Sequence, residues 1–257
     1  MAVDLAFSET GAGPPLVILP GLFGSKRNWA SIARMLGDRH RVITADLRNH
    51  GESPWADRHD YPALADDVAR LVERVAGGAA AVLGHSMGGK AAMMLALTQP
   101  ALVERLVVVD IAPVVSTGTP IAYVRALRSL PLARFTRRSE VADALADVIP
   151  DRAVRNFLSL NAALTDGGLA WTLNLAALER DFELILGFPD VPPGQSYAGP
   201  TLFLTGGASE YVRPEHRPAI DRLFPAAAVA TIAGAGHWVH ADAPEAFVAA
   251  VTRFLDS

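Results

Sequence analysis

A serine stands inside a glycine-rich pattern that can serve nucleophilic chemistry. Residues 84–88 are GHSMG, a G-x-S-x-G pattern that follows the apolar run 79–83 and precedes a run rich in alanine and methionine. A serine on a sharp strand-to-helix turn presents its hydroxyl at the end of a sheet, and the flanking glycines let the chain reverse. The pattern therefore predicts Ser86 as a nucleophile for acyl transfer. The alternative is an idle serine in a glycine-rich turn.

A serine hydroxyl is a weak nucleophile until a base takes its proton. Residues 234–238 are GAGHW and come directly after an expected strand over 228–232. A histidine in such a glycine-rich loop can reach across the end of a sheet. We therefore expect His237 to be the base, whereas His240, which lacks the flanking glycines, is expected to have a structural role.

Short strand patterns that alternate with helical ones must position these side chains. Continuous apolar runs bounded by turn residues favour strands that are buried on both faces of a parallel sheet. The expected fold class is α/β, a mostly parallel open sheet with helices on both faces and a helical cap inserted between two core strands. We expect the core at 1–111 and 200–257 and the cap at 112–199. The expected strands are 3–8, 16–19, 41–45, 79–83, 106–109, 201–204 and 228–232, and the expected cap helices are 121–130, 139–148, 151–160 and 173–186.

Composition excludes several classes of protein. The 257 residues carry 23 Lys and Arg against 27 Asp and Glu, so the basic excess of a nucleic-acid-binding protein is missing. The absence of cysteine excludes thiolate nucleophiles and cysteine-based metal sites. No cluster of metal ligands is evident, and we expect neither a metal nor a cofactor. The N-terminus lacks a signal pattern and the apolar runs are too short to span a membrane, which predicts a cytoplasmic protein.

Several motifs together resemble the α/β-hydrolase superfamily. They are GHSMGG at 84–89, PGLFGS at 20–25, DLRNHGES at 46–53 and AGAGHWVHA at 233–241. The last two are similar to those of small bacterial esterases related to a mitochondrial α/β-hydrolase-domain protein. The resemblance covers nearly the whole chain and implies the α/β-hydrolase fold.

The acid that orients the histidine has two candidates. In the family that the chain resembles, the acid most often follows the strand at 201–204, but this chain has Ser209 in that slot, with Glu210 one residue later. Asp110 instead ends the strand at 106–109, next to the nucleophile strand and within reach of the histidine loop. The small esterases that the chain resembles also use an aspartate there. We expect Asp110 to be the acid and keep Glu210 as the alternative.

Two backbone N–H groups are expected to bind the oxyanion. The residue after the nucleophile, Met87, supplies one of them. The resemblance assigns the other to Leu22, in the loop PGLFGS at 20–25. A further segment, 46–53, contains Asp46 at the end of a strand, but in the resembled family it is a structural turn, and we expect Arg48 to pair locally.

The inserted cap is expected to lie over the ends of the strands, where open α/β sheets bind ligands. Apolar side chains would line a substrate pocket there. For Phe157 and Trp171 an equal alternative is that they only pack the cap helices together. The candidate pocket residues are Phe23, Met87, Phe157, Trp171, Trp238 and Val239.

These residues favour a serine hydrolase that cleaves a small-molecule carboxylic ester through an acyl-enzyme. We expect short to medium acyl chains, because no long apolar tunnel is evident. A cofactor-free perhydrolase and a carbon–carbon or thioester hydrolase would use the same side chains. A ligand receptor with a vestigial triad is the alternative from a different class.

Overall fold

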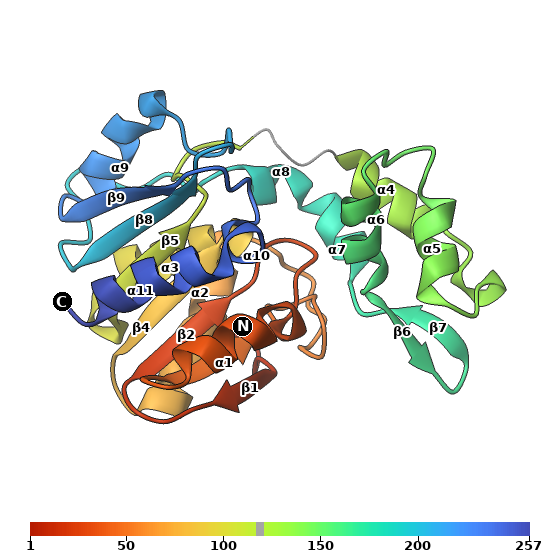
Figure 1. Ribbon diagram of the computed structural model, residues 1–257, viewed down its shortest axis with the longest axis horizontal. Helices are drawn as coiled ribbons and strands as arrows, with labels where there is room; N and C mark the ends of the chain where they lie inside the picture. The colour runs from red at the N-terminus through yellow and green to blue at the C-terminus, as the bar shows by residue number, and fades with distance from the viewer. Residues whose placement is uncertain (117–120) are drawn as a thin grey trace.

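A seven-stranded sheet lies at the centre of the computed structural model, which describes residues 1–116 and 121–257 (Figure 1). The strand order is β1-β3-β2-β4-β5-β8-β9. β1 is antiparallel to β3, and the other neighbours pair in parallel. The expected mostly parallel sheet is therefore confirmed. The strands are β1 (Phe7–Thr10), β2 (Pro15–Leu19), β3 (Arg41–Ala45), β4 (Ala80–His85), β5 (Val103–Val109), β8 (Thr201–Gly206) and β9 (Ala227–Ile232).

Helices cover both faces of this sheet (Figure 1). In β2, Leu16 and Ile18 pack into the cluster that includes α1 and α11, whereas Val17 and Leu19 pack into the cluster on α2 and α3. This burial on both faces explains why the central strands are continuous apolar runs. The helices are α1 (Ala30–Leu36), α2 (Tyr61–Ala76), α3 (Met87–Thr98), α9 (Arg217–Leu223), α10 (Val239–Asp242) and α11 (Pro244–Leu255), with short 3₁₀ turns η1 (Lys26–Trp29), η2 (Pro100–Leu102) and η4 (Pro214–His216).

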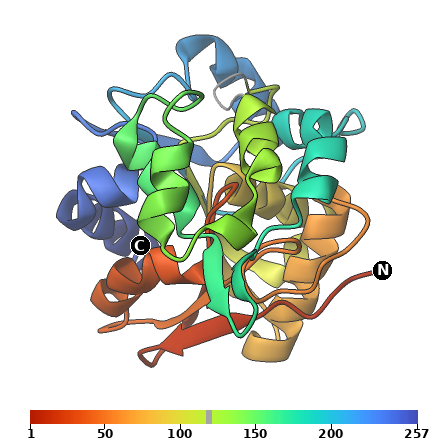
Figure 2. The ribbon, with the colours of Figure 1, turned by 90° about the vertical axis from the view of Figure 1, so that its right-hand side faces the viewer.

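The segment between β5 and β8, here called the inserted segment, lies at the carboxyl ends of the strands (Figures 1 and 2). Its described elements are α4 (Ile121–Ser129), η3 (Leu132–Arg134), α5 (Arg138–Ala144), α6 (Arg152–Ser159), β6 (Ala162–Thr165), β7 (Gly168–Trp171), α7 (Leu175–Arg180) and α8 (Phe182–Leu186). Within the expected cap at 112–199, residues 117–120 lie outside the described residues.

The inserted segment differs from the expected helices in two places. A two-stranded hairpin, β6 and β7, lies where no strand is expected. Its turn leads into Gly168, the first residue of β7, which has φ 102°. The sequence Asp166-Gly167-Gly168 suits such a turn, because glycine adopts positive φ without a steric cost. The expected helix over 173–186 is divided into α7 and α8 at Asp181.

Candidate active site

Ser86 occupies the turn between β4 and α3 with a strained backbone. Its φ is 52° and its ψ is −119°, a region that costs a non-glycine residue about 1–3 kcal/mol. Gly84 and Gly88, two residues to either side of Ser86, leave no room for a Cβ atom. A Cβ on Gly84 would lie 2.2 Å from the carbonyl oxygen of Gly88, and a Cβ on Gly88 would lie 2.4 Å from that of Leu19. The G-x-S-x-G pattern therefore packs the helix closely against β4 and β2.

The structure brings Ser86, His237 and Asp110 into one hydrogen-bonded chain. The Nε2 of His237 is 3.1 Å from the Oγ of Ser86, and the Nδ1 is 2.7 Å from Oδ2 of Asp110. Because a carboxylate only accepts hydrogen bonds, the imidazole proton lies on Nδ1. Nε2 is then free to accept the proton of the serine hydroxyl.

Asp110 is fully buried directly after β5, and its φ is 50°. Its Oδ1 accepts the N–H of Gly206 at 3.0 Å, and its Oδ2 accepts the hydroxyl of Ser209 at 2.5 Å. Ser209, in the slot where the acid is more common, thus donates a hydrogen bond to the carboxylate of Asp110. Glu210, the alternative acid, is exposed.

Two aromatic rings hold His237 in addition to Asp110. His85 lies beneath it and donates from Nε2 to the His237 carbonyl oxygen at 2.8 Å. Tyr211 stacks on the His237 ring, with the centroids 3.7 Å apart. Burial, with a smaller contribution from neighbouring histidines, holds the pKa of His85 well below its usual value. The same two causes lower the pKa of His240 to about 4, so both rings are neutral near pH 7.

Leu22 and Met87 lie beside the nucleophile. Both line, with Ser86, a small pocket next to the serine. Leu22 belongs to a turn that begins at Gly21, and a Cβ on Gly21 would lie 3.1 Å from the Cβ of Ser86. This turn therefore lies directly against Ser86.

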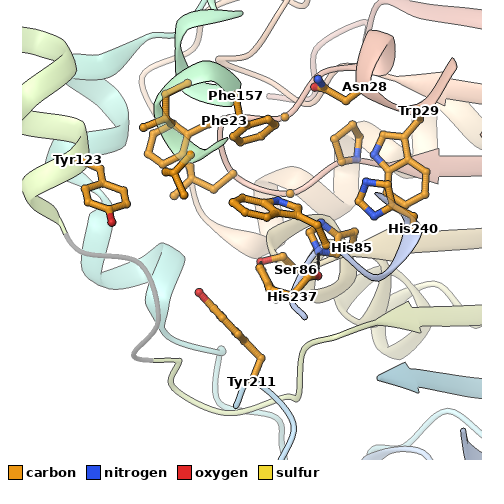
Figure 3. A pocket seen from close by; sticks show the side chains of 17 residues that line it. Phe23, Asn28, Trp29, His85, Ser86, Tyr123, Phe157, Tyr211, His237 and His240 are labelled. Atoms are coloured by element: carbon orange, nitrogen blue, oxygen red, sulfur yellow. Dashed lines mark hydrogen bonds between the residues drawn. The ribbon is translucent and has the colours of Figure 1, made fainter. Parts of the chain in front are cut away.

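A larger cavity of about 210 Å³ opens between Ser86 and the inserted segment (Figure 3). The expected residues Phe23, Phe157 and Trp238 line it, and Phe157 packs on Trp238 with ring centroids 5.6 Å apart. Met87 lines the smaller pocket. Sequence reasoning missed several other apolar and aromatic side chains of the cavity, among them Trp29, Tyr123, Val154, Leu158 and Tyr211.

Two of the expected pocket residues have other surroundings. Val239 is fully buried in the hydrophobic cluster that contains Trp29 and Phe247. Trp171 packs against the small cluster of the hairpin, which includes Leu169. For Trp171 this contact agrees with the alternative of packing within the inserted segment.

Neither a metal site nor a membrane span is found in the described residues. Within 1–116 and 121–257, no three His, Asp or Glu side chains group as metal ligands would. In the same residues, no helix has the length and apolar character needed to cross a bilayer.

Comparisons with known proteins place the chain in a family. A family model described as the alpha/beta hydrolase fold matches residues 14–244. The sn-1-specific diacylglycerol lipase ABHD11 of Mus musculus is 44% identical over 250 residues, which cover 94% of this chain and 81% of that protein. Esterase YbfF of Escherichia coli (strain K12) is 35% identical over 243 residues, 94% of this chain and 93% of its own length. The solved structure of a marine microorganism esterase has a TM-score of 0.93 at 35% identity and covers 98% of this chain and 100% of that one. The chain therefore belongs to the α/β-hydrolase family.

Proposed function

We propose that this enzyme hydrolyses small-molecule carboxylic esters through an acyl-enzyme on Ser86. The observation that carries the proposal is the hydrogen-bonded chain from Ser86 through His237 to Asp110. The names of its relatives, a diacylglycerol lipase and two esterases, support an ester as the substrate.

In this mechanism His237 acts first as a base and then as an acid. Its Nε2 accepts the Ser86 proton while Oγ attacks the ester carbonyl, and Asp110 stabilises the imidazolium that forms. The N–H groups of Leu22 and Met87 bind the oxyanion of the tetrahedral intermediate. Nε2 then donates the proton to the leaving alkoxide as the ester C–O bond breaks. Water repeats the cycle on the acyl-enzyme, which releases the carboxylic acid and restores Ser86.

The inserted segment serves as a cap in this proposal. Tyr123, Val154 and Phe157 bring aromatic and aliphatic surface from that segment to the cavity at Ser86. Such surface excludes water and binds the apolar part of a substrate. An ester with one hydrophobic arm of short to medium length suits this lining.

Turnover of p-nitrophenyl esters from acetate to palmitate tests the proposal. Wild type is expected to hydrolyse the shorter esters, Ser86→Ala is expected to lose turnover, and Ser139→Ala, a change of an exposed serine on α5, is expected to keep it. A folded wild-type protein that is inert toward every ester would contradict the proposal. Halide oxidation with added peroxide would then indicate a perhydrolase, and turnover of a thioester would indicate a thioester hydrolase. A ligand that shifts the melting temperature without turnover would indicate a receptor.

A further inference from the structure

The turn formed by residues 46–53 takes no part in the reaction steps given above, yet its own hydrogen bonds hold it in a fixed shape. Oδ2 of Asp46 accepts the N–H of Glu52 at 2.8 Å, and the hydroxyl of Ser53 donates to the Asp46 carbonyl oxygen at 2.6 Å. Gly51 has φ 57°, and a Cβ there would lie 2.2 Å from Oδ2 of Asp46. These contacts fix the position of the buried His50 within the turn.

The turn that carries Leu22 is unusual in its third residue. The N–H of Gly24 donates to the carbonyl oxygen of Gly21 at 2.9 Å, which closes a four-residue turn with Leu22 and Phe23 at its centre. Phe23 has φ 65°. A positive φ at the third position marks a type II turn, in which glycine is the usual residue. A phenylalanine in this conformation needs contacts elsewhere that hold it there.

His50 holds the central peptide of that turn. The N–H of Phe23 donates to Nε2 of His50 at 3.3 Å. On the other side of the ring, Nδ1 lies 3.0 Å from the carbonyl oxygen of Arg48 and must carry the proton. Nε2 is therefore an acceptor only. Burial lowers the pKa of His50, which keeps the ring in this neutral form.

Three more hydrogen bonds fix the same loop. The amide of Asn161, which precedes β6 in the inserted segment, donates from Nδ2 to the carbonyl oxygen of Phe23 at 2.9 Å. Oδ1 of Asp46 accepts the N–H of Lys26 at 2.6 Å, and its Oδ2 accepts the Lys26 ammonium at 2.9 Å. The 46–53 turn and the inserted segment thus both hold the loop.

We infer that His50 is a positioning residue for the oxyanion-binding N–H of Leu22, with Asn161 as its counterpart in the inserted segment. The type I alternative of the turn is reached by rotating the peptide between Leu22 and Phe23 by roughly 180°. That rotation would direct the Leu22 carbonyl oxygen at the lone pair on Nε2, so His50 disfavours it. The Leu22 N–H belongs to the preceding peptide, between Gly21 and Leu22, so His50 acts on it indirectly, by fixing the turn that carries it. The inference rests on the proposed function, because it assigns these contacts to transition-state stabilisation.

Removing the acceptor tests this role. In His50→Phe the ring keeps its shape but cannot accept the Phe23 N–H, and kcat is expected to fall about 10- to 100-fold with KM changed less than about threefold. His50→Gln offers a carbonyl oxygen near the position of Nε2 and is expected to recover most of kcat. The matched control is His40→Phe, which replaces another buried histidine far from the site and is expected to leave kcat unchanged.

A transition-state analogue separates positioning from general damage. A trifluoromethyl ketone forms a tetrahedral oxyanion on Ser86, so its Ki is expected to weaken in His50→Phe by the same factor as kcat/KM. Wild-type kcat in His50→Phe, or a His50→Gln variant no better than His50→Phe, would overturn the inference. If His50→Phe does not fold, Asn161→Ala takes its place, with Asn156→Ala as control, because Asn156 is an exposed asparagine on α6.

Hydrogen exchange gives an answer that does not depend on turnover. The Phe23 amide is expected to exchange slowly in wild type and His50→Gln and faster in His50→Phe. Equal exchange in all three would overturn the inference even in an active esterase. Faster exchange in His50→Phe, in a protein that hydrolyses no ester, would leave the contact established while the proposed function failed.

Discussion

Replacing Asp110 with asparagine is expected to stop ester hydrolysis by placing the proton of His237 on the wrong nitrogen. Gly206 N–H lies 3.0 Å from Oδ1 of Asp110, and Nδ1 of His237 lies 2.7 Å from Oδ2. In Asp110→Asn the side-chain oxygen stays on the Gly206 N–H, so the NH₂ group faces His237. An NH₂ group donates, which makes Nδ1 an acceptor and places the ring proton on Nε2. That tautomer cannot take the proton of Ser86.

The expected loss is large and leaves the fold intact. The same aspartate-to-asparagine change in a serine-protease triad lowers kcat about 10⁴-fold, which corresponds to about 5.5 kcal/mol of transition-state stabilisation. The asparagine has the size of the aspartate and keeps the hydrogen bond from Gly206, so unfolding is not the cause.

Steady-state hydrolysis of p-nitrophenyl butyrate, with melting curves to verify folding, measures the effect. Glu210→Gln, which changes the exposed alternative acid, is expected to keep kcat within about threefold of wild type. The reasoning fails if Asp110→Asn retains more than a tenth of wild-type kcat. It also fails if Glu210→Gln causes the loss instead.

Three further predictions concern packing, charge and the cavity. Gly88→Ala places a Cβ 2.4 Å from the carbonyl oxygen of Leu19 and is expected to abolish activity or folding. The control Gly78→Ala, which has open space at its Cβ, is expected to change neither. An active Gly88→Ala variant contradicts this. Burial lowers the pKa of Lys90 to about 7 from 10.5, so the folded state releases this proton before the unfolded chain does. The free energy of unfolding of wild type, measured in urea relative to that of Lys90→Met, is therefore expected to rise by about 3 kcal/mol between pH 6 and 9.5. A difference between the two proteins that does not change with pH contradicts this. Phe157→Ala enlarges the cavity and is expected to move the preferred acyl length upward from an optimum below twelve carbons; an unchanged p-nitrophenyl ester profile argues against it.

The sequence predicts the turn around Ser86 well because the requirements of that turn are local. The close approach of the backbone at Gly84 and Gly88 and the positive φ of Ser86 all lie within five residues, and each restricts the residue type. The central strands of the sheet are predicted equally well, since burial on both faces leaves continuous apolar runs. The edge strand β1 is at Phe7–Thr10 instead of the expected 3–8, because its largely exposed residues leave no such run.

The surroundings of His237 could not be predicted in the same way. Tyr211, which stacks on its ring, lies 26 positions away in the chain. No pattern at such distances marks a tyrosine as a stacking partner. The inserted segment is similar: Trp171 and Phe157 are both partly buried aromatic residues, but only the path of the chain through the hairpin decides which one meets the cavity.

The place of the acid shows why the sequence leaves two candidates. β5 and β8 are parallel neighbours, with Val109 opposite Leu204, so their carboxyl ends lie side by side. A carboxylate after either strand can therefore reach the same imidazole. The order of the strands alone does not tell which of the two carries it. Here Asp110 follows β5, and the hydroxyl of Ser209 and the N–H of Gly206, both after or at the end of β8, donate to it. The end of β8 and the loop after it thus supply the donors that hold the carboxylate of Asp110, the proposed acid.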